Sequence, residues 1–147
     1  MAETTTFETL LATEGRVVYK TRGVSMEPML RQDRDLVVIE VPKGRLKRYD
    51  VAFYRRGKSY VLHRVIRVAE DGYRIRGDNT YSIEIVPESN VIGVLTGFCR
   101  KGKEYTTTDR TYRLYVRLWC AVYPVRALWV RVRRFGGRIL RKLGLRK

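Results

Sequence analysis

DVAFYRRGKSYVLHRVIRVAEDGYRIRG, residues 50–77, contains three strand-like runs separated by two turns. The runs are rich in Val, Ile, Tyr and Phe, which strands favour. RRGKS (residues 55–59) and AEDGY (residues 69–73) carry the Gly and Asp residues of hairpin turns. Connections this short join antiparallel neighbours, whereas parallel strands need a much longer crossover. This stretch therefore predicts an antiparallel meander.

Similar runs lie on both sides of the meander. RVVYKT (16–21) and DLVVIEV (35–41) precede it, and VIGVLTGF (91–98) follows it. RKGKEYTTTDR (100–110) has the composition of an exposed hairpin or linker. A chain of 147 residues fits one domain with a substantial core. We therefore expect a mainly β fold, with a compact antiparallel β domain over residues 1–111.

A short helix is expected before the first strand. TTFE, residues 5–8, fits a capping box in which Thr5 accepts from first-turn amides and Glu8 reaches back. Apolar residues then share one face, and Gly15 can end the helix. The pattern predicts a helix from about Thr6 to Thr13.

The apolar period becomes helical from Leu114 onward. Apolar residues recur at three- and four-residue steps, and the arginines fall largely on another face. This predicts a basic amphipathic helical tail over residues 112–147. Pro124 is expected to kink or split the helix, and the pair Gly136-Gly137 is expected to break it again.

The net charge of +16 is concentrated in this tail. Residues 112–147 hold eleven Arg and Lys and no Asp or Glu, whereas residues 1–111 hold twenty basic and fifteen acidic residues. A basic tail predicts an anionic partner, either lipid or nucleic acid. Aromatic residues among aliphatic ones are typical of a helix that lies in a membrane interface, and the tail has them at Trp119, Tyr123, Trp129 and Phe135.

We therefore expect peripheral association of residues 112–147 with an anionic membrane surface. The side of the membrane stays open, and the cytoplasmic face is physically simpler. Packing of the tail on an apolar face of the β domain or on a partner helix is an alternative of nearly equal weight. Nucleic-acid binding ranks third, because the apolar face is larger than phosphate binding requires.

The cysteine count and the distribution of apolar residues argue against several kinds of site and segment. Cys99 and Cys120 are too few for a disulfide framework or a zinc site, and we expect both to be small apolar fillers. The segment MAETTTFETL lacks a secretory signal pattern, and no run of about 18 apolar residues suggests a spanning helix. We expect neither a metal nor a cofactor.

Three residues are candidates for chemistry. Ser25 lies in GVSMEPML (23–30), where a strand-like segment must bend; His63 is the one histidine; and Asp78 lies in a Gly-Asp-Asn turn. Each has an ordinary structural reading as a turn residue or a buried histidine. Together they could form a proton relay, because a serine needs a base and imidazole titrates near neutral pH. A carboxylate on the far ring nitrogen would fix the tautomer of the base.

GVSMEPML resembles the nucleophile motif of the signal peptidases and the related self-cleaving repressors. RDLVVIE and RYDVAFYRR are similar to the two strand boxes that follow it, YVLHRVIRV to the base-bearing strand, and IRGDNT to the Gly-Asp-Asn box. The resemblance covers about residues 16–98. His63 stands where typical bacterial signal peptidases have lysine, which resembles the archaeal and endoplasmic-reticulum branch, also found in some spore-forming bacteria.

The resemblance implies a role for each matching residue. Ser25 would be the nucleophile and His63 the general base. Asp78 is the leading candidate for the acid, and Glu84 is the alternative, because that branch usually carries a second acid after Gly-Asp-Asn. The backbone amides of Ser25 and Val24 would bind the oxyanion, since position 23 is glycine where many bacterial members have serine.

Met26 and Pro28 of the same motif are assigned to substrate binding. The implied activity is that of a serine endopeptidase that cleaves a signal or leader segment of a precursor protein, after a small residue and near a membrane. The family normally has a spanning helix, often ahead of the serine, which this sequence lacks there.

Two other functions remain open. One is a catalytically silent relative that binds extended peptides by strand addition. The other is a membrane-surface adaptor that acts through the basic helix.

Overall fold

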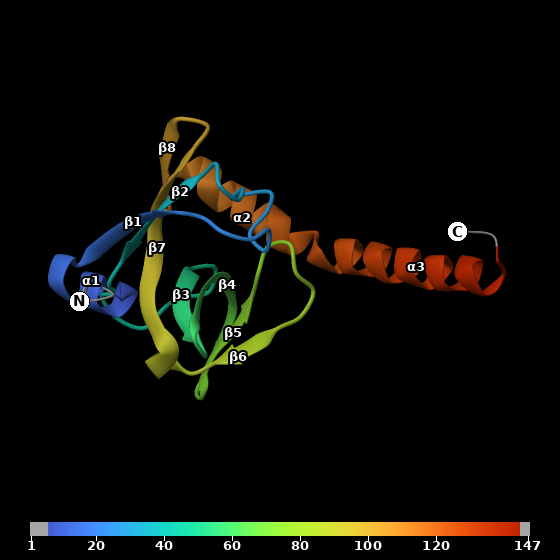
Figure 1. Ribbon diagram of the computed structural model, residues 1–147, viewed down its shortest axis with the longest axis horizontal. Coiled ribbons are helices and arrows are strands. Elements are labelled where there is room, and N and C mark those ends of the chain that lie inside the picture. Colours follow the sequence, from blue (N-terminus) through green and yellow to red (C-terminus); the bar gives the residue numbers. More distant parts are fainter. Residues whose placement is uncertain (1–5, 145–147) are drawn as a thin grey trace, which may run out of the picture. The chain divides into compact units, whose positions relative to one another are not determined.

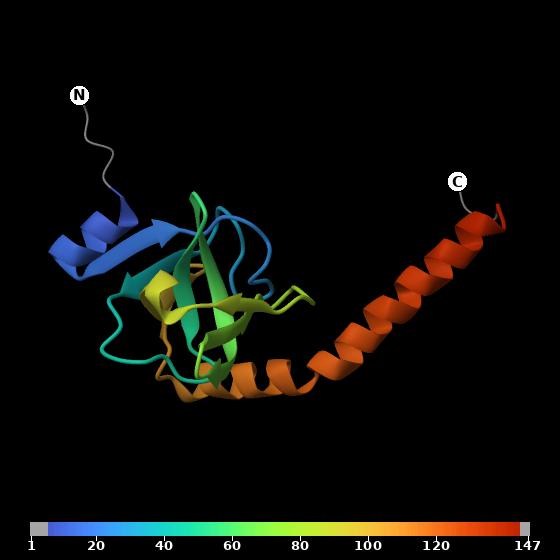
Figure 2. The ribbon, with the colours of Figure 1, turned by 90° about the horizontal axis from the view of Figure 1, so that it is seen from below.

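The computed structural model describes residues 6–144, and the chain divides into two units, one up to Arg113 and one from Leu114 onward. The first unit is built on a curled antiparallel sheet with the strand order β1-β2-β7-β3-β4-β5-β6, in which β8 also pairs with β7 (Figures 1 and 2). The expected mainly β, antiparallel fold is confirmed. The strands are β1 (Arg16–Lys20), β2 (Leu36–Glu40), β3 (Val51–Arg56), β4 (Ser59–Ala69), β5 (Gly72–Arg76), β6 (Glu84–Val86), β7 (Val91–Arg100) and β8 (Lys103–Thr106).

The meander over residues 50–77 is confirmed as β3, β4 and β5. Arg56 pairs with Ser59 across the first turn, and Ala69 pairs with Gly72 across the second. Gly57 and Gly72 have positive φ angles of 61° and 128°, a backbone conformation that glycine adopts without a Cβ penalty. The two hairpins hold β4 in the middle of the meander, with a neighbour on each side.

One strand, β6, goes beyond the expectation, and another, β8, forms one of the two expected alternatives. The three-residue β6 pairs with β5 and was not predicted. The segment expected to be a hairpin or linker forms the β7–β8 hairpin, in which Arg100 pairs with Lys103. Strand β7 also pairs with β2 and β3, so it joins the outer strands to the meander.

Helix α1 (Phe7–Glu14) lies against β1 (Figure 1). Its N-cap is Thr6, whose side chain accepts from the Thr9 amide, so the expected start shifts by one residue. The expected cap, Thr5, lies outside the described residues. The Glu8 carboxylate accepts from the Tyr60 hydroxyl. Gly15 ends the helix in the left-handed conformation, as expected.

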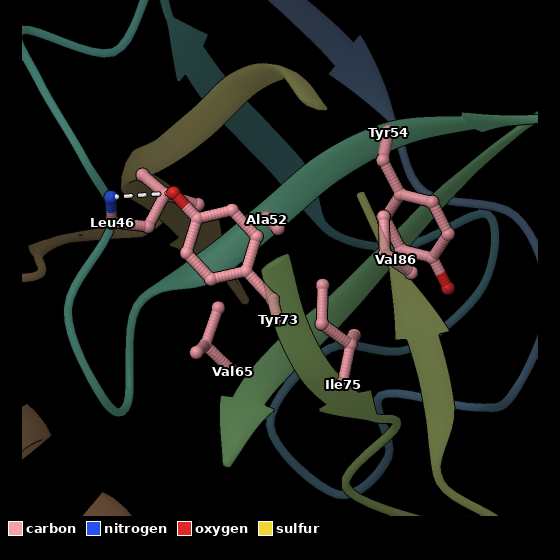
Figure 3. Packing of buried hydrophobic residues seen from close by; sticks show 7 residues of the cluster. All are labelled: Leu46, Ala52, Tyr54, Val65, Tyr73, Ile75 and Val86. Carbon is pink, nitrogen blue, oxygen red and sulfur yellow. Dashed lines mark hydrogen bonds between the residues drawn. The ribbon is translucent and has the colours of Figure 1, made fainter. Parts of the chain in front are cut away.

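A core cluster fills one face of the meander (Figure 3). Tyr73 spans it, and its hydroxyl accepts from the Leu46 amide at 3.0 Å, so the phenol buries its ring without losing its polar partner. The other buried members come from β3, β4, β5 and β6; they are Ala52, Tyr54, Val65, Ile75 and Val86. This cluster makes the strands that flank His63 a rigid support.

Phe53 and Tyr54 follow one another on β3 and point to opposite faces of the sheet, because the side-chain period of a strand is two. Tyr54 enters the core cluster. Phe53 instead contacts an aromatic group formed with Phe7, Tyr19 and Tyr60, at centroid distances of 5.2–5.7 Å. The two faces of β3 thus serve different layers.

Two helices follow the sheet, α2 (Arg110–Ala121) and α3 (Tyr123–Lys142). The expected split at Pro124 is confirmed, since α3 begins next to it. The expected break at Gly136-Gly137 is wrong, because α3 continues through both glycines to Lys142. An interior glycine costs a helix only about 1 kcal/mol. Within residues 6–144, no helix is long and apolar enough to cross a membrane.

Candidate active site

A groove of about 990 Å³ opens on the first unit. One wall is formed by Tyr19 to Gly23 with Ser25 and Met26, and another by Ser59 to His63 of β4. Glu84 also lines the groove. Four of the predicted site residues, Ser25, Met26, His63 and Glu84, therefore face a space large enough for several residues of a peptide.

Ser25 and His63 are in hydrogen-bond contact. The Ser25 hydroxyl oxygen lies 2.9 Å from His63 Nε2. His63 is largely buried on β4, whereas Ser25 is half-buried in the turn after β1. A rigid strand thus presents the imidazole to a serine on a bend, which is the geometry in which a base can remove a hydroxyl proton.

The Gly-Asp-Asn segment holds the serine turn in place. The Asn79 amide donates to the Ser25 carbonyl at 2.8 Å, and its side chain donates to the Val24 carbonyl at 3.2 Å. A Cβ on Gly77 would lie 2.6 Å from the Ser25 carbonyl oxygen and 3.1 Å from His63 Nε2. A side chain at position 77 would therefore force Ser25 and His63 apart.

Glu84 is the carboxylate beside the other nitrogen of the imidazole. Its Oε1 lies 3.6 Å from His63 Nδ1. The Tyr54 hydroxyl lies between the two groups, 3.3 Å from Nδ1 and 3.1 Å from Glu84 Oε2, to which it donates. Arg56 donates to Glu84 Oε1 at 2.7 Å. The carboxylate is thus held on both oxygens.

The surroundings of His63 keep its imidazole neutral at pH 7. Burial lowers the pKa of His63 below its ordinary value, the Glu84 carboxylate opposes this shift, and the Arg56 cation adds to it. A neutral imidazole can accept a proton at once. His63 is therefore in the protonation state that a general base requires.

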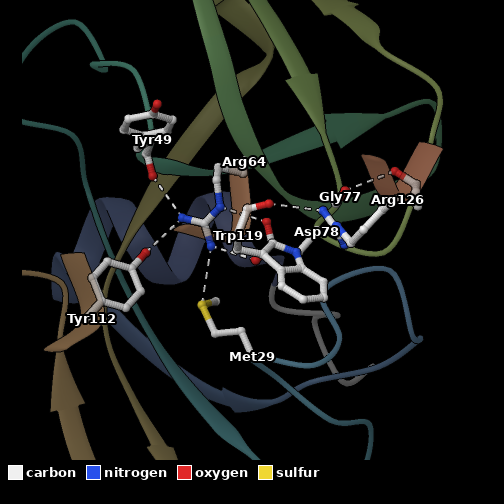
Figure 4. Close-up of polar contacts among 9 residues, drawn as sticks. Met29, Tyr49, Arg64, Gly77, Asp78, Tyr112, Trp119 and Arg126 are labelled. Atoms are coloured by element: carbon white, nitrogen blue, oxygen red, sulfur yellow. Dashed lines mark hydrogen bonds and ion pairs between the residues drawn. The ribbon is translucent and has the colours of Figure 1, made fainter. Parts of the chain in front are cut away.

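Asp78 is part of a different cluster, centred on Arg64 (Figure 4). Both Asp78 oxygens accept from Arg64 at 2.7 Å, and the two side chains are 2% and 0% exposed. Arg64 also donates to the Tyr49 carbonyl and to the Tyr112 hydroxyl, each at 3.0 Å, and contacts the sulfur of Met29 at 3.3 Å. Burying a guanidinium is costly unless its charge is paired and its donors are hydrogen-bonded, and these contacts provide both.

This cluster joins the segments around the site. Asp78 belongs to the Gly-Asp-Asn turn, Met29 to the turn that carries the serine, and Tyr49 to the connection before β3. Arg64 follows His63 on β4, so the two side chains leave opposite faces of the strand. The structure therefore brings Ser25, His63 and Glu84 together and places Asp78 with Arg64.

The remaining predicted residues surround the serine. The Ser25 amide donates to no other group within residues 6–144. Val24 is exposed beside it, and its carbonyl accepts from Asn79. Met26 is buried and lines the groove. Pro28 lies in the same turn, after a cis peptide bond, and outside the groove lining.

Three residues of the site were missed in the sequence. Tyr54 and Arg56 stand on β3 two residues apart, so they share a face of the strand. The hairpin signal pairs β3 with the strand of His63, and this could have placed Tyr54 beside it. Gly77 was visible only as part of the Gly-Asp-Asn motif, and its close approach to Ser25 depends on tertiary packing.

Within the described part of the chain, no three His, Cys, Asp or Glu side chains gather as metal ligands. Comparisons of the chain with protein-family models, curated proteins and solved structures find no match. Function is therefore inferred from the geometry of the site.

Proposed function

We propose that the chain is a serine endopeptidase of the signal-peptidase type. The observation that carries this proposal is the 2.9 Å contact between Ser25 Oγ and His63 Nε2, with the Glu84 carboxylate on the far side of the same imidazole. Ordinary turn serines make local backbone bonds instead. The motifs that resemble the signal peptidases contribute the nucleophile and the base of this arrangement.

The chemistry follows from the position of each group. His63 takes the proton of Ser25 as the serine oxygen attacks the peptide carbonyl, and it then gives that proton to the leaving amine. An acyl-enzyme on Ser25 results, and water attacks it with His63 again as the base. The Ser25 amide, which has no partner among residues 6–144, is available to donate to the oxyanion.

The groove favours an extended peptide as substrate. Strand β1 is at one end of the strand order and borders the groove through Tyr19 and Lys20. A peptide could add to this edge as a further strand and lie across Ser25. The buried apolar side chains of Met26 and Leu30 face the groove and suit the apolar segment of a leader. Cleavage after a small residue is implied by the resemblance.

Paired substitutions test the proposal. The full chain is incubated with a library of extended leader peptides, and products are identified by mass spectrometry. We expect cleavage by the unchanged chain and by Ser59→Ala, a control serine that also lines the groove. Ser25→Ala and His63→Ala should each abolish cleavage while circular dichroism stays unchanged. Cleavage that survives Ser25→Ala contradicts the proposal. Peptide binding without cleavage would instead support a silent peptide-binding relative.

We also propose that α3 attaches the protein to an anionic membrane surface. A stripe of exposed apolar side chains recurs at helical spacing along α3 and its C-cap, with Trp129 at 66% and Phe135 at 62% exposed. The others in this stripe are Val125, Leu128, Val132, Ile139 and Leu143. By helical period, Arg131 and Arg138 lie beside Phe135 along the edge of the stripe, and Arg134 lies on the opposite face. An uncovered apolar stripe flanked by cations suits a lipid interface, where each basic residue adds about 1 kcal/mol.

Vesicle sedimentation tests this second proposal. We expect the full chain to bind vesicles that contain phosphatidylglycerol and to dissociate as salt increases, with little binding to pure phosphatidylcholine. Trp129→Ser with Phe135→Ser removes two large apolar groups without changing the charge, and it should weaken binding at least about tenfold. Val130→Ser, outside the apolar stripe, is the matched control. Absence of binding at low salt contradicts the proposal. Self-association through the stripe or binding to oligonucleotides alone would also contradict it.

A further inference from the structure

The Tyr54 hydroxyl has two polar neighbours and a single proton. Glu84 is an acceptor when ionised, and Tyr54 donates to its Oε2 at 3.1 Å. The same hydroxyl oxygen lies 3.3 Å from His63 Nδ1. A proton that the phenol donates to Glu84 is not available to Nδ1, and in that arrangement the phenol can only accept from the imidazole. Nδ1 must then carry the imidazole proton.

This assignment fixes the other end of the ring. A neutral imidazole protonated at Nδ1 has an unprotonated Nε2, which accepts a hydrogen bond. Nε2 is the nitrogen that lies 2.9 Å from the Ser25 oxygen. The donors therefore run in one direction, from Ser25 to His63, from His63 to Tyr54, and from Tyr54 to Glu84.

We propose that Tyr54 is the positioning residue of this site, linking Glu84 to His63 and holding the imidazole in the tautomer that accepts the serine proton. The direct separation of Nδ1 from Glu84 Oε1 is 3.6 Å, beyond the usual range of a hydrogen bond between these atoms. The Tyr54 hydroxyl contacts both groups and so connects them. The third member of the relay is thus a tyrosine and a glutamate acting together, and the catalytic consequence rests on the proposed function.

The environment of Tyr54 suits this role. Its side chain is 1% exposed within the core cluster, so packing fixes the position of the hydroxyl (Figure 3). Burial, together with the nearby Glu84 carboxylate, raises the pKa of Tyr54, so the phenol keeps its proton throughout the neutral range. Arg56 donates to Oε1 of Glu84, and this leaves Oε2 to accept from Tyr54.

The tautomer can be measured directly, because His63 is the one histidine of the chain. In protein labelled with ¹⁵N-histidine, at a pH at which the ring is neutral, two-dimensional NMR distinguishes the protonated nitrogen from the unprotonated one. We expect the unchanged chain to show Nδ1 protonated. Tyr54→Phe keeps the ring and removes both hydrogen bonds, so it should give a mixture of the two tautomers.

Tyr73→Phe is the matched control. Tyr73 is as buried as Tyr54, and its hydroxyl has its own hydrogen-bond partner, the Leu46 amide, away from His63. It should leave the tautomer unchanged. If the chain cleaves peptides, Tyr54→Phe should lower kcat by about 10- to 100-fold, the range for a lost hydrogen bond to a group that becomes charged. KM should stay unchanged, because Tyr54 does not line the groove.

The inference is overturned if the unchanged chain carries its proton on Nε2, or if Tyr54→Phe keeps the Nδ1 tautomer. The tautomer does not depend on cleavage, so a chain without peptidase activity would end the proposed function and still test this inference. If Tyr54→Phe does not fold, expression with 3-fluorotyrosine replaces it. A fluorinated phenol is a weaker acceptor, so the Nδ1 proton should shift upfield; an unchanged proton shift overturns the inference.

Discussion

Substitution of Asp78 should mainly lower the stability of the fold, whereas substitution of Glu84 should mainly lower catalytic activity. Asp78→Asn takes the charge from a buried ion pair and leaves the Arg64 guanidinium, 0% exposed, with only neutral partners. Breaking a buried pair in this way costs about 3–5 kcal/mol. At about 4 °C per kcal/mol for a domain of this size, the melting temperature should fall by about 12–20 °C.

Glu84→Gln should change stability little and mainly lower catalytic activity. The Arg56 side chain that it pairs with is 56% exposed, and an exposed pair contributes about 1 kcal/mol or less. The melting temperature should therefore fall by no more than about 4 °C. His63 loses the carboxylate that it reaches through Tyr54, however, and loss of this charged partner should lower kcat by about 10- to 100-fold, as for Tyr54→Phe.

Thermal unfolding followed by circular dichroism, combined with peptide cleavage below the melting temperature of each variant, separates these effects. We expect folded Asp78→Asn to retain most of its activity and Glu84→Gln to lose most of it. If Asp78→Asn melts like the unchanged chain and is inactive, while Glu84→Gln is active, then Asp78 is the acid and this reasoning is wrong.

Two further substitutions test the electrostatics and the packing around His63. Arg56→Gln removes a cation that disfavours the imidazolium, so the pKa of His63 should rise and the acid limb of kcat/KM should move to higher pH; a pH profile that stays in place or moves to lower pH would contradict this. Gly77→Ala should lower kcat by about 10²-fold by displacing Ser25 from His63. The control Gly44→Ala, whose Cβ would have no atom within 4 Å, should leave kcat unchanged. Equal cleavage rates for the two variants would argue against the close approach of Gly77 to Ser25.

The meander was readable from the sequence because its turns are short and carry the residues that hairpins require. Each strand-like run of the sequence became a strand, within one or two residues at its ends. Strand β6 was not predicted, because EIV is only three residues long and too short to show a strand pattern. It is a strand because it pairs with β5. The glycine pair in α3 was given too much weight, because twenty residues of helix can absorb a small local cost.

Sequence analysis named Ser25 and His63 and put Asp78 ahead of Glu84 as the acid, whereas in the structure Glu84 is the carboxylate beside the imidazole. The choice between the two acids depends on which face of β4 each acid approaches, and that is a tertiary property. One signal was available in the sequence. Arg64 follows His63 inside an apolar strand, and a buried arginine needs a carboxylate of its own. Asp78 meets that need, which leaves Glu84 for the imidazole.

The most direct test of the central claim asks whether Ser25 is a nucleophile activated by His63. The chain is treated with a small activated ester such as p-nitrophenyl acetate, and acetylated serines are located by peptide mass spectrometry. Ser59 and Ser82 line the same groove and serve as internal controls. We expect rapid acetylation of Ser25 alone among these three serines and its loss in His63→Ala. Acetylation of Ser25 no faster than that of Ser59 and Ser82, or unaffected by the loss of the imidazole, would contradict the account.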